Sequence, residues 1–260
     1  MTSPTYKLSF QLYSTRNFPP QDEVLEGLAA MGYDAVEPWL PDFDTNAKEF
    51  RRRIDNAGLE CLGFHMPLRG LINEPMRFID IAHTLGDSPL MIPPFVVPED
   101  RPVHADGWRR IGEQLAKGAE LAQANDLRVA WHNHDFEYRP LEDGSRPIDL
   151  MLEAAGEQVG FEIDFAWVTR AWADPYTELK KYAPRIVAIQ LKDTAPPGTS
   201  SEGGWTPPGD GMVDWDAIWP LFATTPADHL VVEHDNPADW RQVAQRARDF
   251  VVAKGAMNHD

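Results

Sequence analysis

Short apolar segments alternate along the chain with longer amphipathic ones. The short segments have the length of buried β-strands and are followed by polar or turn-forming residues. We predict strands at residues 7–13, 33–39, 60–66, 89–95, 127–133, 160–165, 185–192 and 229–235.

The longer segments have the periodicity and the end signals of helices. Residues 20–32 begin with proline and acidic residues and end at Gly32, as helix polarity prefers. In residues 105–125, Ile111, Leu115, Ala119 and Leu121 recur at helical intervals. We predict further helices within residues 45–58, 213–222 and 238–255.

Eight strand–helix units predict an α/β fold, a (β/α)8 TIM barrel, as a single domain over residues 1–260. An open doubly wound sheet is the competing fold, but it favours a glycine-rich phosphate turn, and neither GxGxxG nor GxxxxGK[ST] occurs. Residues 193–211, rich in Gly and Pro, follow the seventh strand and are predicted to form a lid or a mouth loop.

Composition narrows the function classes. The formal net charge of −17 argues against a nucleic-acid partner, which favours a basic surface. Cys61 is the only cysteine, so an intramolecular disulfide and a cysteine-rich metal site are excluded. We find neither a signal peptide nor an apolar run long enough for a membrane span, and we expect a cytoplasmic protein without a membrane partner.

Ligand-type side chains collect at the carboxyl ends of the predicted strands, where TIM barrels carry their chemistry. Several carboxylates in one pocket repel each other and are costly to bury, and a divalent metal ion relieves both problems. The residues at these positions are Glu37, His65, the segment 132–137 (HNHDFE), Asp164, Gln190, Lys192 and Glu233.

Each of these residues also has a plain structural interpretation. Glu37 can pair with an arginine near the barrel mouth, and His65 can be a core-edge histidine. Lys192 and Asp193 can form an ordinary turn pair. Asp164 and Glu233 follow apolar residues, which is less typical of idle surface carboxylates.

Several motifs together resemble the xylose-isomerase-like TIM-barrel sugar (phosphate) isomerase/epimerase superfamily over nearly the whole chain. YDAVEPW (33–39) is similar to the second-strand glutamate segment, and WHNHDFEY (131–138) to the fifth-strand motif of one branch. IDFAW, IQLKD and VVEHD resemble the motifs of strands six, seven and eight, and PGDGMVDW resembles a glycine-rich segment before the seventh helix.

The resemblance implies one divalent metal ion, with Mn²⁺ or Mg²⁺ expected and Co²⁺ or Zn²⁺ as alternatives. It implies Asp164 and Glu233 as ligands, and Gln190 as a ligand where many relatives carry histidine. The remaining ligand is either His132 or Glu137. We expect Glu137, because that choice leaves His134 available as a base.

The resemblance also implies the reaction, which is proton abstraction next to a carbonyl through a metal-stabilised enediolate. We expect a sugar isomerase or epimerase. The alternative is a lyase or dehydratase of keto-sugars, keto-inositols or 3-keto-glycosides on the same site. The expected catalytic residues are His134, Lys192 and Glu37, and the expected substrate-binding residues are His65, His132, Trp39 and Trp167.

Two other functions remain open at this point. A metal-dependent hydrolase of the endonuclease type would want a histidine-rich multi-metal cluster and a basic groove, and the net charge argues against it. A catalytically silent sugar-binding barrel would show lost ligands, of which Gln190 is the one hint. The expected partner is a small sugar or keto-sugar, and a homo-oligomer is possible.

Overall fold

The computed structural model describes residues 5–199 and 201–256, and within them a nine-stranded parallel sheet forms the centre of the molecule. Each predicted strand segment contains a strand, and the segment 60–66 contains two, separated at Leu62. The strands of this sheet are β1 (Lys7–Gln11), β2 (Ala35–Glu37), β3 (Glu60–Cys61), β4 (Gly63–His65), β5 (Leu90–Ile92), β6 (Arg128–His132), β7 (Val159–Asp164), β8 (Ile186–Leu191) and β11 (His229–Val232).

The sheet curls into a nearly closed ring. Its strand order is β3-β2-β1-β11-β8-β7-β6-β5-β4, so the two ends of the sheet are the consecutive halves of one predicted strand. A parallel bridge between Trp39 and His65 adds contact across the gap. The predicted TIM-barrel fold is confirmed. The predicted domain limits, 1–260, include residues 1–4, 200 and 257–260, which lie outside the described part of the chain.

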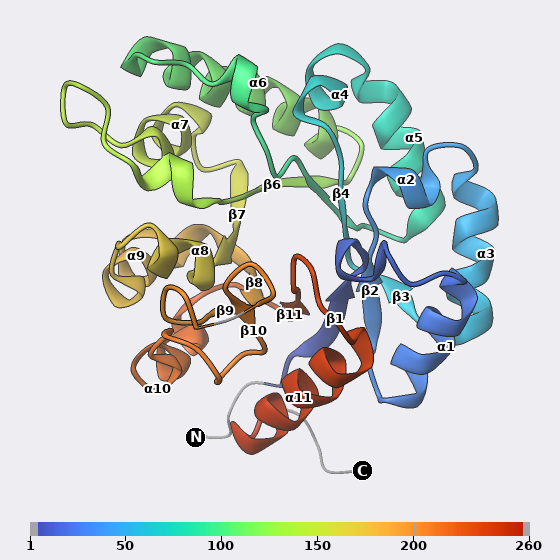
Figure 1. Ribbon diagram of the computed structural model, residues 1–260. Coiled ribbons are helices and arrows are strands. Elements are labelled where there is room, and N and C mark those ends of the chain that lie inside the picture. The colour runs from blue at the N-terminus through green and yellow to red at the C-terminus, as the bar shows by residue number, and fades with distance from the viewer. Residues whose placement is uncertain (1–4, 200, 257–260) are drawn as a thin grey trace.

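Helices surround this ring on its outer side (Figure 1). They are α1 (Gln21–Ala30), α2 (Leu40–Phe43), α3 (Ala47–Ala57), α4 (Leu68–Asn73), α5 (Pro75–Leu85), α6 (Ala105–Gln123), α7 (Pro147–Ala155), α8 (Phe165–Arg170), α9 (Pro175–Tyr182), α10 (Trp215–Ile218) and α11 (Trp240–Ala253). Short 3₁₀ turns are η1 (Leu12–Thr15), η2 (Pro98–Asp100), η3 (Asp135–Tyr138), η4 (Ala183–Arg185) and η5 (Trp219–Thr224). None of the helices in the described ranges has the length and apolarity that crossing a membrane requires.

The helix limits follow from local sequence. The Asn46 side chain accepts a hydrogen bond from the Glu49 amide and caps the start of α3. Gly58 ends that helix with φ 74°, a left-handed conformation that glycine adopts without steric cost. Both signals were readable in the sequence, which is why α3 lies within its predicted range.

The two faces of the strands differ in chemistry because successive side chains point to opposite sides. Outward-facing residues such as Phe10 pack against the helices, with Phe10 in edge-to-face contact with Tyr33 and Trp240. Inward, a small apolar cluster of Leu90, Ile92, Ala130 and Ala188 fills only part of the barrel. Many of the other interior residues are polar, among them Gln11, Glu37, Glu162 and Gln190, and this is where the candidate chemistry lies.

The predicted mouth loop after β8 contains an antiparallel hairpin, formed by β9 (Asp193–Thr194) and β10 (Trp205–Thr206). The buried Asp193 carboxylate accepts hydrogen bonds from the amides of Gly209 and Val213 and from the Trp215 indole. A Cβ at Gly211 would come within 2.1 Å of this carboxylate. The loop is therefore anchored at its base by one side chain.

Candidate active site

A cavity of about 870 Å³ opens at the carboxyl ends of the strands. Its wall carries all four residues predicted to bind substrate, His65, His132, Trp39 and Trp167, together with His134 and Glu233. Much of the remaining lining is apolar, although Arg69, Glu99, Asp100 and Gln114 lie among these residues. The apolar lining residues are Leu40, Met66, Pro67, Leu68, Ile72, Pro94, Phe95, Val96, Val97 and Ile111.

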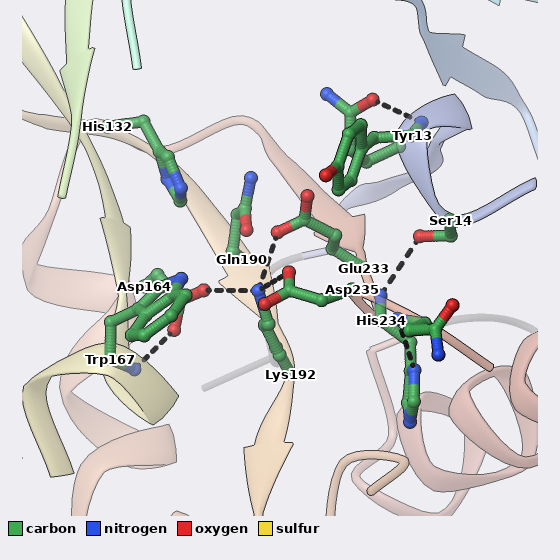
Figure 2. Close-up of polar contacts among 12 residues, drawn as sticks. Tyr13, Ser14, His132, Asp164, Trp167, Gln190, Lys192, Glu233, His234 and Asp235 are labelled. Carbon is green, nitrogen blue, oxygen red and sulfur yellow. Dashed lines mark hydrogen bonds and ion pairs between the residues drawn. The ribbon is translucent and has the colours of Figure 1, made fainter. Parts of the chain in front are cut away.

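Three residues from three strands meet at the inner end of this cavity, and two of them, His132 and Glu233, line it. His132 ends β6, Asp164 ends β7 and Glu233 follows β11, and each offers a ligand atom within 4.8 Å of the other two. We call these residues the floor cluster. All three are buried. Figure 2 shows them converging, together with Gln190 from β8, on the space around the Lys192 ammonium group.

Local hydrogen bonds orient Asp164 toward the cluster. Its backbone amide and carbonyl are both bonded to the Asn133 side chain, which ties the end of β6 to β7. Its Oδ1 accepts a hydrogen bond from the Trp167 amide at 2.8 Å and caps α8. The other oxygen, Oδ2, is buried without a hydrogen-bond partner and remains available as a ligand.

Lys192 supplies positive charge beside the cluster. Its Nζ donates to Glu233 Oε2 at 3.0 Å and to Asp235, and it lies 3.7 Å from Asp164 Oδ2 (Figure 2). Burial lowers the pKa of this ammonium, but the charges of Asp235, Glu233 and Asp164 outweigh burial and raise it. Lys192 is therefore a permanent cation. Its positive charge neutralises only one of the three negative charges of Asp164, Glu233 and Asp235.

The donors at the cavity floor fit a divalent cation. Asp164 Oδ2, His132 Nδ1 and Gln190 Oε1 are all buried and have no hydrogen-bond partner. Burial is the largest of the causes that together raise the pKa of Asp164 to about 8. The Lys192 charge opposes this rise, and the Glu233 charge adds to it. One imidazole and several oxygens form a ligand set that Mn²⁺, Mg²⁺, Co²⁺ or Zn²⁺ can use.

Glu137 lies away from the floor cluster. Its Oε1 accepts from the Trp131 indole at 3.0 Å, and its Oε2 accepts from the His134 amide. Because the chain turns through η3 after β6, this carboxylate bonds back to its own strand, and His132 is the residue that reaches Asp164 and Glu233. Burial raises the pKa of Glu137 well above its usual value.

His134, the predicted base, lines the cavity beside the floor cluster. Its ring lies 4.9 Å from those of His132 and Trp167, centroid to centroid. Burial and then the Lys192 charge lower its pKa to about 3, so the imidazole is neutral near pH 7. Its Nδ1 is buried and has no hydrogen-bond partner, which leaves one ring nitrogen able to take a proton.

Glu37, the third predicted catalytic residue, is not among the residues that line the cavity. Its carboxylate lies deeper in the barrel, where Oε1 accepts from Gln11 at 2.9 Å and approaches His65 Nε2 at 3.0 Å. The His65 ring separates Glu37 from the cavity space. Burial opposes protonation of His65, but the charge of Glu37 and the bonds to Glu162 and Glu37 outweigh it and raise its pKa to about 10.

Two residues of this region were not singled out by the sequence. Asp235 lines the cavity two residues beyond Glu233, and Glu162 lies in the barrel two residues before Asp164. Alternate residues of a strand share a face, so the periodicity of β7 could have indicated Glu162. Asp235 lies beyond the end of β11 at Val232, and its place depends on the fold of that loop. Glu162 Oε1 accepts a hydrogen bond from Gln190 Nε2 at 2.8 Å.

Several known proteins are similar to this chain in sequence or in structure. Inosose dehydratase of Bacillus thuringiensis is 23% identical over 223 residues, covering 74% of this chain and 73% of that protein. A sugar phosphate isomerase/epimerase from Parabacteroides distasonis has a similar structure, with a TM-score of 0.76, 20% identity and coverage of 98% and 95%. The structure of IolI protein with a bound zinc atom gives a TM-score of 0.74, 16% identity and coverage of 96% and 98%.

The family profile of the xylose isomerase-like TIM barrel matches residues 25–253. This range includes the floor cluster, His134 and Lys192. It confirms the resemblance to this family. The chain belongs to the xylose isomerase-like TIM barrel family.

Proposed function

We propose that the protein is a divalent-metal-dependent enzyme that removes a proton next to the carbonyl group of an unphosphorylated sugar or cyclitol. The observation that carries this proposal is the floor cluster of His132, Asp164 and Glu233, with the unpartnered, neutral His134 imidazole beside it in one cavity.

In this proposal His132, Asp164 and Glu233 hold the metal ion, and Gln190 Oε1 is a fourth candidate ligand. The bound ion would polarise the substrate carbonyl and stabilise the negative charge that develops on its oxygen. Glu137 is left out of the ligand set because both of its oxygens are already hydrogen-bonded.

The residues around the floor cluster have separate tasks in this mechanism. His134 takes the proton, because its imidazole is neutral and has a nitrogen without a partner. Lys192 holds Glu233 and Asp235 in place through its ammonium group. The rings of Trp39 and Trp167 face the cavity and provide flat surfaces for the C–H groups of a sugar.

The charge of the cavity supports an unphosphorylated substrate. Among its described lining residues, Arg69 is the one arginine or lysine, and it pairs with Asp100 at 2.6 Å. Glu99, Glu233 and Asp235 add negative charge to the same wall. A phosphate group would meet more carboxylates than cations there.

Elimination, catalysed by a lyase or dehydratase, is the outcome that the cavity favours. Its volume of about 870 Å³ lies at the upper end of the ~300–1,000 Å³ typical of pockets for drug-sized ligands. The apolar outer wall would accept an apolar substituent, such as the departing group of a 3-keto-glycoside. The name of the similar inosose dehydratase, found at 23% identity, is consistent with this type of reaction.

Isomerisation or epimerisation is the second candidate. It is favoured by Asp235, which lines the cavity from the segment after β11, whereas His134 approaches from the segment after β6. Two groups from different segments would allow a proton to be taken at one position and returned at another.

The test is a substrate panel in D₂O with the purified protein and added Mn²⁺, Mg²⁺, Co²⁺ or Zn²⁺. Keto-sugars, keto-inositols and 3-keto-glycosides with apolar aglycones are followed by NMR, with phosphorylated keto-sugars as the matched control. We expect metal-dependent α-proton exchange together with release of the aglycone. Exchange without release would favour isomerisation, and no exchange with any compound and metal would contradict the proposed function.

A further inference from the structure

A second polar group lies inside the barrel, apart from the cavity wall. It consists of Glu37 from β2, Glu162 from β7 and His229 from the start of β11, which we call the inner group. The two glutamates have no exposed surface, and His229 is 2% exposed. One ligand atom of each residue lies within 4.8 Å of those of the other two.

Each of the two glutamates makes its hydrogen bonds to described residues through its Oε1 atom. Glu37 Oε1 is bonded to Gln11 and approaches His65, and Glu162 Oε1 is bonded to Gln190 and approaches His65 at 3.4 Å. Glu37 Oε2, Glu162 Oε2 and His229 Nε2 are buried without a hydrogen-bond partner.

His229 is oriented as an acceptor. Its Nδ1 lies 2.6 Å from Asp228 Oδ1, and because a carboxylate accepts a hydrogen bond, Nδ1 carries the ring proton. The lone pair of His229 is then on Nε2, inside the barrel. The same arrangement, in which a carboxylate fixes the tautomer of a metal-binding histidine, recurs in zinc sites.

The inner group thus brings together atoms that all accept and none that donates. Two carboxylate oxygens and an imidazole lone pair repel each other unless a cation or an added proton lies among them. Gly63 makes this packing possible, since a Cβ there would come within 2.7 Å of Glu37 Oε2. His65 supplies one counter-charge from the Oε1 side of both glutamates. The buried Glu37 Oε2, Glu162 Oε2 and His229 Nε2 have no hydrogen-bond donor of their own.

We propose that Glu37 Oε2, Glu162 Oε2 and His229 Nε2 form a second metal site, separate from the floor cluster, that holds a small divalent transition-metal ion of the Zn²⁺ type. Zinc takes imidazole nitrogen and carboxylate oxygen at about 2.0–2.2 Å, which places its ligands about 3–4 Å from each other. One ligand atom of each residue already lies within 4.8 Å of those of the other two, so rotations of these side chains would bring a ligand set to this geometry.

This ion is structural. It links β2, β7 and β11, which are not neighbours in the strand order, and so it clamps the barrel from inside. Glu37, Glu162 and His229 do not line the cavity themselves, although Glu162 Oε1 lies 3.4 Å from His65 and 3.7 Å from His132, which do. The inference is independent of the proposed function.

The experiment measures zinc in protein expressed with added ZnCl₂ and purified without chelator. Two double variants are compared with the wild type. Asp164→Asn/Glu233→Gln removes the floor cluster. Glu37→Gln/Glu162→Gln removes the inner group and keeps the side-chain volume. We expect two equivalents of zinc in the wild type and about one in each double variant. In chelator, we expect the zinc of the inner group to dissociate from the wild-type protein more slowly than the zinc of the floor cluster. The variant that lacks the inner group should therefore show no slow phase of zinc release.

A crystal of the wild-type protein allows the zinc position to be measured without any substitution that could affect folding. Diffraction at the zinc absorption edge should show an anomalous peak between Glu37, Glu162 and His229. Absence of that peak, or a floor-cluster variant that folds but carries no zinc, would overturn the proposal and leave a proton shared between the two carboxyl groups. Neither measurement uses enzymatic activity, so failure of the proposed reaction does not affect the result.

Discussion

The segment 132–137 shows how neighbouring residues of one motif take different tasks. His132 ends a strand and points into the barrel, His134 lies in the cavity, and Glu137 bonds back to Trp131. The difference arises because β6 ends at His132, so the alternation of a strand no longer applies beyond it.

Replacing either histidine by alanine should separate their roles. His132→Ala removes a proposed ligand, so we expect metal affinity to fall by about 10-fold or more, with activity falling in step. His134→Ala should leave metal binding intact and lower turnover by about 10²–10⁴, the usual contribution of a general base. Titration calorimetry with Mn²⁺ and α-proton exchange on the same preparations measure both quantities. Equal loss of metal in the two variants would contradict this division.

Asp42 gives a second prediction at the residue scale. Burial, only partly offset by hydrogen bonds from the Trp39 amide and the Gln21 side chain, raises its pKa to about 6. Because the folded-state pKa lies above the unfolded value, the protonated form is favoured in the folded protein. The charged form therefore costs stability as the pH rises from about 4 through about 6.

Asp42→Asn should remove this pH-dependent cost. The free energy of unfolding of the variant, relative to the wild type, should rise by about 2–3 kcal/mol between pH 4 and pH 7.5. Urea denaturation at a series of pH values measures the difference. A difference that does not change with pH would show that burial of Asp42 does not disfavour its charge.

At the scale of elements, the loop between β8 and α10 depends on Asp193. This carboxylate joins the start of the loop to Gly209, Val213 and Trp215 near its end. Trp205, in the hairpin, packs against Trp167 of the cavity wall with ring centroids 4.4 Å apart. The anchoring of the loop therefore bears on the shape of the cavity.

Asp193→Ala should destabilise the protein and loosen this loop. We expect the free energy of unfolding to fall by about 3 kcal/mol, because buried donors lose their charged acceptor. Hydrogen exchange should accelerate at Gly209 and Val213. Asp216→Ala is the matched control, since it removes an ion pair between Lys254 and an exposed carboxylate and should change the free energy of unfolding little. Similar losses in the two variants would rule out a special role for Asp193.

For the whole molecule, 41 acidic residues outnumber 24 basic ones. The unbalanced negative charges repel each other, and folding brings them closer together. Ion pairs such as Lys7–Glu60 and Arg77–Asp44 offset it locally, but many lie at the exposed surface, where each contributes little. Salt screens both the long-range repulsion and the attraction within these ion pairs. We expect the repulsion to be the larger of the two.

Raising the ionic strength should stabilise the protein. Between 0.01 and 0.2 M NaCl we expect a gain of about 1 kcal/mol, or roughly 2–4 °C in melting temperature, since the Debye length shortens to below about 10 Å. Calorimetry in NaCl and in choline chloride at equal ionic strength separates screening from sodium binding. A falling melting temperature would mean that screened ion pairs outweigh the net repulsion.

The barrel and the convergence of Asp164 with Glu233 could be predicted from the sequence alone. Strand positions follow from apolar patterning, and parallel strands in a barrel necessarily bring their carboxyl ends to one face. His132 and Glu137 could not be distinguished in this way, because the choice depends on where β6 ends and on the direction of the η3 turn.

Only the tertiary structure decided the depth of each side chain in the barrel. Glu37 ends its strand as Asp164 does, yet Glu37 lies beneath His65, whereas Asp164 belongs to the cavity floor. His229 begins its strand and still meets Glu37 and Glu162. The tilt and stagger of barrel strands determine which residues of different strands share a layer, and this relation between distant segments is absent from any local pattern of residues.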